Sequence, residues 1–159
     1  MNGDIVGTNL PSSMWALVKK RAGPGLVLEE VPVPQPSPGE VLVKVLRTGI
    51  CGTDLYIERW NDWAARTIPL PLIPGHEFVG EVMFAGPGTG GVEPGQLVSA
   101  EGHVVCGQCR HCLDAKGHLC LHAQGLGVAR PGAFAQYVRV PAASLWRHRP
   151  GPPGHGRVV

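Results

Sequence analysis

Alternation of apolar and polar side chains predicts a series of short strands. The clearest run covers residues 40–50, where successive side chains alternate between two faces of the predicted strand. Val41, Val43 and Val45 form one face, and Leu42, Lys44 and Leu46 form the other. A period of two is typical of a strand. Further strands are expected over residues 14–20, 26–31, 75–85, 96–100 and 133–140.

Glycine and proline mark the boundaries between these strands, with 23 glycines and 16 prolines in the chain. Residues 22–25 join the first two strands as a hairpin, and the proline-rich stretches 33–39 and 67–74 must be connectors. Residues 51–60 are expected to form one or two helical turns. The glycine-rich segment 86–91 predicts a hairpin turn and no phosphate-binding loop, because it contains Pro87 and no helix follows. The predicted fold is mainly β and barrel-like.

The length of 159 residues suffices for one domain with a hydrophobic core. We expect this domain over residues 14–146, with tails over 1–13 and 147–159 that lack an apolar pattern. Residues 102–125 have little periodicity and many cysteines and histidines, which predicts an irregular lobe. The net charge is only +2 and no lysine or arginine run occurs, which argues against a nucleic-acid surface.

The cellular compartment affects how the cysteines are interpreted. No apolar stretch approaches the roughly 18 residues of a membrane span, and no signal peptide is expected at the N-terminus. These features predict a cytoplasmic protein without a membrane partner. Cysteines stay reduced there, so closely spaced ones are better explained as metal ligands than as disulfides.

Four cysteines form the strongest motif of the chain, with the spacing C-x2-C-x2-C-x7-C. They are Cys106, Cys109, Cys112 and Cys120. Four thiolates can enclose one tetrahedral Zn²⁺, and such a closed site is structural because it leaves no position for substrate. The lobe has no other means of packing, so the metal would supply its folding energy.

Two alternatives to zinc remain for this motif. The four residues could be ordinary reduced cysteines. They could also hold an iron–sulfur cluster, since bacterial ferredoxins share the C-x2-C-x2-C start. In ferredoxins, however, the next cysteine follows after about three residues and precedes a proline. Here the gap is seven residues and Leu121 follows.

Cys51 and His76 suggest a second metal site, although the residues alone give weak support. Each residue lies next to a predicted strand, in the segments Gly-Ile-Cys51-Gly-Thr-Asp and Gly-His76-Glu-Phe-Val-Gly. A single cysteine is more often a small core residue, and a single histidine a satisfied polar group.

These two segments, followed by the four-cysteine motif, resemble zinc-dependent medium-chain alcohol dehydrogenases. The likeness covers residues 14–146 and is closer to the L-threonine 3-dehydrogenase branch. It rests there on the stretches Trp-Asn-Asp-Trp63, Glu-Gly-His103 and Gly-Leu-Gly-Val128, with Arg-Pro-Gly132. The resemblance implies a GroES-like, partly open β-barrel with a zinc-binding loop lobe.

The resemblance also implies roles for individual residues. Cys51 and His76 would be ligands of a catalytic zinc, and Glu77 a nearby, alternating ligand. Zinc would lower the pKa of a bound alcohol so that it can lose a hydride. Thr53 would pass the proton outward. By the same analogy, Glu101 and His103 would line the pocket of a small alcohol or amino-alcohol substrate.

The chain departs from the family pattern at three places. Tyr56 stands where the threonine branch has a histidine in its proton relay, and a phenol with a pKa near 10 is a poor relay at neutral pH. Gln96-Leu97 replaces a charged Asp-Arg step. After Trp146 the resemblance stops, as a shifted reading frame or premature end would produce, so the NAD(P)-binding Rossmann domain and one catalytic zinc ligand are expected to be missing.

Two functions from different classes follow. The first is the zinc-binding catalytic domain of an NAD(P)-dependent dehydrogenase acting on a secondary alcohol such as L-threonine, which we expect to be inactive alone. The second is a non-enzymatic, zinc-stabilised β-module that binds a partner. The family resemblance also allows a homo-oligomer.

Overall fold

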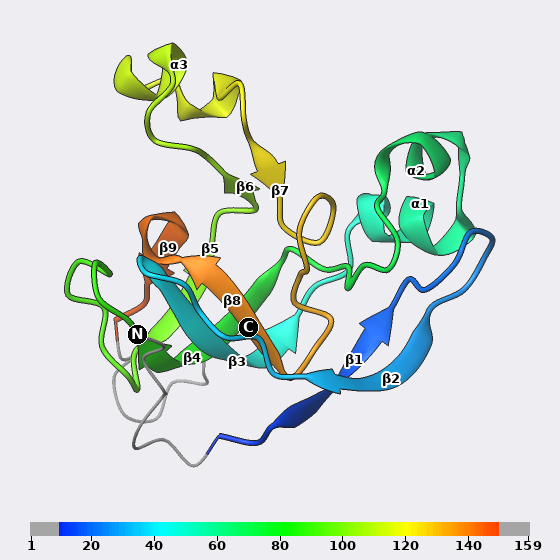
Figure 1. Cartoon of the computed structure of the whole chain (residues 1–159), viewed down its shortest axis with the longest axis horizontal. Helices are drawn as coiled ribbons and strands as arrows, with labels where there is room; N and C mark the ends of the chain where they lie inside the picture. Colours follow the sequence, from blue (N-terminus) through cyan, green and yellow to red (C-terminus); the bar gives the residue numbers. More distant parts are fainter. Residues whose placement is uncertain (1–9, 150–159) are drawn as a thin grey trace.

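The computed structural model describes residues 10–149, whose regular secondary structure is mainly strand (Figure 1). The expected mainly β fold is confirmed. The outer parts of both expected tails, residues 1–9 and 150–159, lie outside the described range. Within that range no helix has the length and apolar character needed to cross a membrane.

An open antiparallel sheet of five strands forms the centre, in the order β8-β3-β4-β5-β9. Its strands are β3 (Glu40–Thr48), β4 (Phe78–Ala85), β5 (Leu97–Ala100), β8 (Tyr137–Pro141) and β9 (Leu145–Arg147). A 3₁₀ turn, η2 (Ala142–Ser144), joins β8 to β9. β9 was not predicted. The predicted start of the C-terminal tail at residue 147 is therefore too early, because Arg147 still belongs to β9 and pairs with Val98 of β5.

A hairpin of β1 (Ser13–Val18) and β2 (Val27–Pro32) forms a separate two-stranded sheet that is hydrogen-bonded to the central sheet through one connecting segment. The link is residues 134–136: the Gln136 amide donates to the Trp15 carbonyl at 3.1 Å, and the Val45 amide donates to the Gln136 carbonyl at 2.9 Å. The strand expected from residue 133 is thus shorter than predicted, because its first part serves as this link. The expected N-terminal tail also ends earlier, since Ser13 belongs to β1.

The core lies on both faces of β3. Val41 and Val43 pack with Phe78, Val98 and Val140 on one face. Leu42 packs on the other face with Met14 and Val33 of the hairpin. The predicted alternation of β3 therefore places two different hydrophobic clusters on the two sides of one strand.

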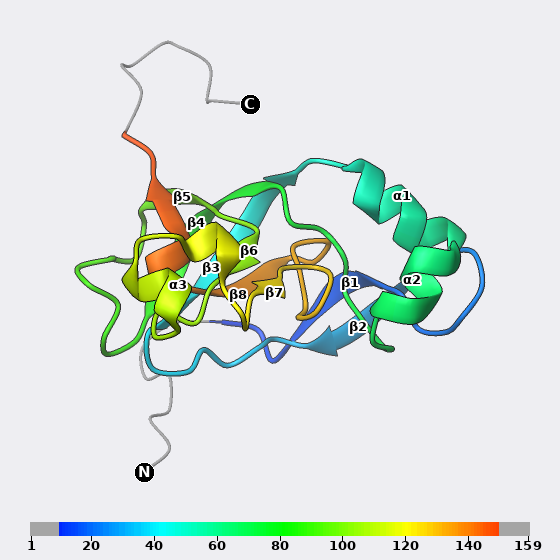
Figure 2. The same cartoon turned by 90° about the horizontal axis from the view of Figure 1, so that it is seen from above.

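Two helices follow β3 and lie beside the turn between β1 and β2, away from β5 and β9, as both views show (Figures 1 and 2). α1 (Gly52–Arg59) confirms the expected helical turns after Cys51. α2 (Asp62–Thr67) was not predicted, although Asn61 is a favourable N-cap whose side chain accepts a hydrogen bond from the Ala64 amide. The chain then returns to β4, which begins at Phe78 and not at residue 75, because residues 75–77 belong to the loop before it.

The lobe of residues 102–125 projects away from the sheets (Figure 1). A two-residue pairing of β6 (His103–Val104) with β7 (Gln124–Gly125) closes its base. Above the base lie α3 (Arg110–Leu113) and the 3₁₀ turn η1 (Gly117–Leu119), neither of which contains a buried residue. The lobe therefore has no hydrophobic core of its own.

Candidate metal centres

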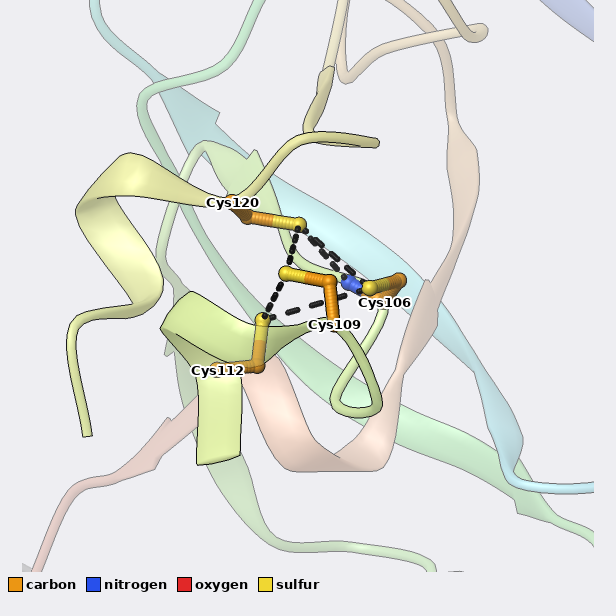
Figure 3. Close-up of side chains that lie close together, drawn as sticks. All are labelled: Cys106, Cys109, Cys112 and Cys120. Carbon is orange, nitrogen blue, oxygen red and sulfur yellow. Dashed lines mark hydrogen bonds between the residues drawn. The ribbon is translucent and has the colours of Figure 1, made fainter. Parts of the chain in front are cut away.

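The four lobe cysteines converge on one point, although they come from three separate segments (Figure 3). The Sγ–Sγ distances are 3.5 Å for Cys106–Cys120, 3.6 Å for Cys109–Cys112, and 4.0 Å for both Cys106–Cys112 and Cys109–Cys120. Four thiolates bound at about 2.3 Å around one tetrahedral ion would lie about 3.8 Å apart. The sulfurs therefore fit a single ion, whereas a four-iron cluster binds each cysteine through a different iron and needs wider spacing.

Backbone amides of the lobe donate to these sulfurs. The amides of Cys106 and His122 approach the Cys120 sulfur at 3.3 and 3.4 Å. The amides of Leu121 and Cys112 lower the pKa of the Cys109 thiol to about 6. Burial and the neighbouring thiols raise the pKa of Cys112 to about 12. The amides thus favour the first thiolate, while full ionisation of such a close cluster requires a cation among the sulfurs.

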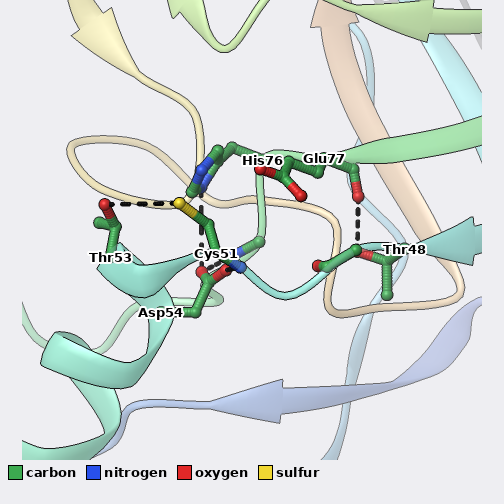
Figure 4. Close-up of polar contacts among 8 residues, drawn as sticks. Thr48, Cys51, Thr53, Asp54, His76 and Glu77 are labelled. Atoms are coloured by element: carbon green, nitrogen blue, oxygen red, sulfur yellow. Dashed lines mark hydrogen bonds and ion pairs between the residues drawn. The ribbon is translucent and has the colours of Figure 1, made fainter.

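Cys51, His76 and Glu77 form a second cluster, with one ligand atom from each lying within 4.8 Å of the others. Cys51 is the N-cap of α1, and the other two residues precede β4. Thr53 lies in the first turn of α1, with its hydroxyl 3.9 Å from the Cys51 sulfur (Figure 4). The Glu77 carbonyl accepts hydrogen bonds from the Gly49 amide and the Thr48 hydroxyl, which ties the end of β3 to this loop.

Asp54 joins the two segments of this cluster and was missed at the sequence level. Its carboxylate is buried and accepts from the Cys51 amide at 2.8 Å and from the Gly75 amide at 3.2 Å. The same group lies 3.8 Å from Nδ1 of His76, which is buried and has no hydrogen bond within the described residues (Figure 4). The spacing Cys51-x-x-Asp54 was the available signal, since an acid at N3 of a helix commonly reaches back to the N-cap amide.

Both clusters offer the donors that zinc prefers. Four thiolates fit a closed structural site, and one thiolate, one imidazole and one carboxylate fit an open site. An acid that orients the second nitrogen of a ligand histidine is a common feature of zinc sites.

Glu101 and His103 flank Gly102, which lies against His76, but both residues line a cavity that is separate from the second cluster. Together with Trp146 they line a cavity of about 460 Å³ between the lobe and β9, which contains none of the three clustered ligands. Their side chains pair at 3.1 Å, and the amide and ring of His103 hold the pKa of Glu101 below its ordinary value. Gly102 between them lies against His76, since a Cβ added there would be 3.6 Å from the His76 Cβ.

Comparison with known proteins gives the family. The model of the alcohol dehydrogenase GroES-like domain matches residues 37–150. The chain is 56% identical over 136 residues to an L-threonine 3-dehydrogenase of Streptomyces avermitilis, covering 86% of this chain and 40% of that protein. A second one, from Solibacter usitatus, is 51% identical over 138 residues, with 87% and 40% covered. The chain thus spans about 40% of the length of these relatives.

Solved structures agree with this result. A thermostable alcohol dehydrogenase of Pyrobaculum aerophilum with bound cobalt and zinc superposes with a TM-score of 0.76 at 34% identity, covering 87% of this chain and 42% of that one. An acetophenone reductase of Geotrichum candidum in complex with NAD gives 0.76 at 33% identity, with 93% and 42% covered. From the family model, the fold and the two sets of converging ligands, we conclude that the chain belongs to the alcohol dehydrogenase GroES-like domain family.

Proposed function

We propose that the chain is the zinc-binding catalytic part of an NAD(P)-dependent dehydrogenase that oxidises a secondary alcohol, with L-threonine as the first substrate to test. The observation that carries the proposal is the convergence of Cys51, His76 and Glu77 beside the Thr53 hydroxyl. The similarity to L-threonine 3-dehydrogenases supports the choice of substrate.

In this proposal Cys51 and His76 hold a zinc ion, and Glu77 is a third, exchangeable ligand. The ion supplies Lewis-acid chemistry that lowers the pKa of the alcohol substrate. Asp54 keeps the His76 ring oriented by facing Nδ1, so that the other ring nitrogen serves as the ligand. Thr53 accepts the substrate proton at its hydroxyl and donates its own proton outward.

The four lobe cysteines hold a second zinc with a structural role. Four sulfur–sulfur distances of 3.5–4.0 Å, the convergence of all four sulfurs within 4.8 Å and the amide donors support this assignment. Glu101 and His103 remain candidates for the substrate pocket, because the backbone at Gly102 lies against His76.

Metal content tests the site assignments. Mass spectrometry of the purified chain after equilibration with zinc should give two zinc ions per chain. Cys51→Ser and Cys109→Ser should each reduce the content to one. One ion in the unmodified chain would contradict the catalytic site and favour a zinc-stabilised module without catalysis. Iron with visible absorbance would contradict zinc in the lobe.

Activity tests the substrate. Residues 1–146 should be joined to the part of the Streptomyces avermitilis relative that follows its matched region. We expect this chimera to form NADH from L-threonine, and the same chimera with Cys51→Ser to form none. A folded chimera with two zinc ions and no turnover of any secondary alcohol would contradict the proposed reaction.

A further inference from the structure

A tight backbone contact lies directly before His76. Gly132, Ala133 and Phe134 donate their amides to the carbonyls of residues 73–75, at 2.7 Å to Ile73, 2.9 Å to Gly75 and 2.9 Å to Pro74. Three consecutive amides therefore bind three consecutive carbonyls of the segment that leads into His76.

Three glycines make this approach feasible. A Cβ on Gly132 would lie 2.0 Å from the Gly75 carbonyl oxygen, and a Cβ on Gly127 would lie 2.6 Å from the Gly75 nitrogen. Gly75 itself has a φ of +93° and faces Phe134 at similarly short range. No side chain fits between the two backbones, so any displacement of this loop must displace residue 75 and with it His76.

The loop that contains Gly127 and Gly132 also contacts the segment around Gly102, which lies against His76. The Leu126 amide donates to the Gly102 carbonyl at 2.8 Å, and Leu126 is buried in the main core cluster. A Cβ at Gly102 would lie 3.6 Å from Cβ of His76. Residues 125–134, which we call the bracket loop, thus contact both segments that flank His76.

An ion pair fixes the bracket loop to the main sheet. Arg130 donates to Oε1 of Glu40 at 2.6 Å, and both side chains are only 14% exposed. Arg139 of β8 approaches the other oxygen of Glu40 at 3.7 Å. The Gly127 amide donates to the Arg130 carbonyl at 2.8 Å, which links the ion pair to the glycine contact.

We propose that the bracket loop is the positioning device of the catalytic metal site, with Gly127, Gly132 and Arg130 as positioning residues for His76. The inference rests on the proposed function, in which His76 is a metal ligand. None of the three residues needs to touch metal or substrate. They act through the backbone of Gly75, because this backbone determines where the His76 ring lies.

The test compares two glycine variants with equal backbone strain. Gly127→Ala and Gly90→Ala both place alanine at a positive φ, +68° and +63°, but only position 127 has atoms within contact range of the new Cβ. Cobalt binding to each chain is followed by absorption, with the four-cysteine site as an internal control in the same molecule. Gly127→Ala should weaken cobalt binding at Cys51 and His76 by about tenfold or more, while the four-cysteine site is unchanged.

Arg130 provides a milder second perturbation. Arg130→Met should weaken cobalt binding at the same site, and Arg130→Lys should restore part of it, because an ammonium can still pair with Glu40. Equal cobalt affinities in the unmodified chain, Gly127→Ala, Arg130→Met and Gly90→Ala would overturn the proposal.

A metal-independent measurement separates this inference from the proposed function. The ring carbon-bound protons of His76 should shift or broaden in the NMR spectra of Gly127→Ala and Arg130→Met, but not of Gly90→Ala. If the unmodified chain binds cobalt only at the four cysteines, the proposed catalytic site fails, and the His76 signals still decide the positioning role. Unchanged signals in both loop variants would overturn it.

Discussion

A single carboxylate, that of Asp54, organises the second cluster. The carboxylate is buried, accepts hydrogen bonds from the Cys51 amide and from the amide of Gly75 just before His76, and faces the ring of His76. Each ligand segment is held by a different oxygen, Oδ2 for Cys51 and Oδ1 for Gly75, so the loss of either acceptor uncouples the two segments, although the carboxylate contributes no ligand itself.

Asp54→Asn should weaken zinc binding at the Cys51 and His76 site by about 10- to 100-fold, because an amide cannot accept both backbone hydrogen bonds and also face the ring as an anion. The four-cysteine site should keep its affinity. Asp62→Asn, in the first turn of α2, is the matched control. Competition with a chelator of known affinity measures both sites. Equal zinc affinities for Asp54→Asn and Asp62→Asn would contradict the orienting role.

Glu40 is expected to make stability depend on pH. Burial raises the pKa of its carboxyl, but the hydrogen bond and charge of Arg130 and the Ser37 amide outweigh burial, so the pKa is lowered overall. A lowered carboxyl pKa stabilises the fold above the ordinary value and loses this contribution as the pH falls through the lowered value. Glu40→Gln should lower the free energy of unfolding by about 2 kcal/mol at neutral pH, and by progressively less below about pH 4.

Urea unfolding between acidic and neutral pH measures this difference. Glu29→Gln is the control, because Glu29 pairs with the exposed Lys20 and such surface pairs contribute little. A stability loss for Glu40→Gln that stays constant across the pH range would rule out the ion pair as its origin.

At the scale of elements, polar groups stabilise the metal lobe, which has no hydrophobic core, and helix α1, which contributes to a small one. The lobe depends on four sulfurs. α1 is fixed at its first turn by Asp54 and at its end by Lys19, which is fully buried.

Removal of zinc should unfold the lobe selectively. α3 and η1 contain no buried residue, so under the proposed assignment the sulfur–metal bonds would define their geometry. After treatment with a strong chelator under reducing conditions, limited proteolysis should cut first within residues 106–120, while the five-stranded sheet resists. Restored zinc should restore resistance. Cleavage that is independent of zinc would show that the lobe is stable by other means.

Lys19 secures the end of α1 against the first hairpin. Its ammonium donates to the carbonyls of Gly23, Gly25 and Glu58, and lies 5.1 Å from the ring centre of Trp60. Burial lowers the Lys19 pKa, although the charge of Glu58 partly compensates. The ammonium thus donates to three backbone carbonyls, which join the end of α1 to the turn between β1 and β2.

Lys19→Met should destabilise the chain by about 3 kcal/mol, because it removes three hydrogen bonds that the buried ammonium donates. The neighbouring Lys20 is exposed, so Lys20→Met is the control and should change stability by less than about 0.5 kcal/mol. Thermal and urea unfolding measure both variants. Equal stability of the two would show that the buried ammonium contributes nothing beyond its packing.

At the scale of the whole molecule, the sequence predicted the strands better than their connections. Period-two alternation and proline positions determined β1 to β5 closely, because these patterns reflect burial of alternate faces. α2 and β9 were missed: α2 depends on the cap at Asn61 and on packing against α1, and β9 exists only by pairing with β5. Long-range pairing leaves little trace in local sequence.

The two ligand sets were predicted to different degrees. The lobe cysteines come together through short-range turns, so their spacing alone indicated a common centre. Cys51 and His76 are 25 positions apart, so the residues alone supported their pairing weakly and the family resemblance was needed to strengthen it. The supports of the second site, Asp54 and the bracket loop, were not predicted, because they act through backbone contacts between segments distant in sequence.

The glycine contact before His76 has a consequence for how this domain tolerates mutation. A Cβ at position 127 or 132 would meet main-chain atoms, so a larger residue there cannot be compensated by a smaller side chain opposite; Gly75 is constrained by its φ of +93° and by the Phe134 nitrogen, which an added Cβ would approach to 2.8 Å. The exposed positions 129 and 131 in the same loop carry no such constraint. A saturation library scored for metal retention should therefore show three positions that accept only glycine, interleaved with neighbours that accept almost any residue.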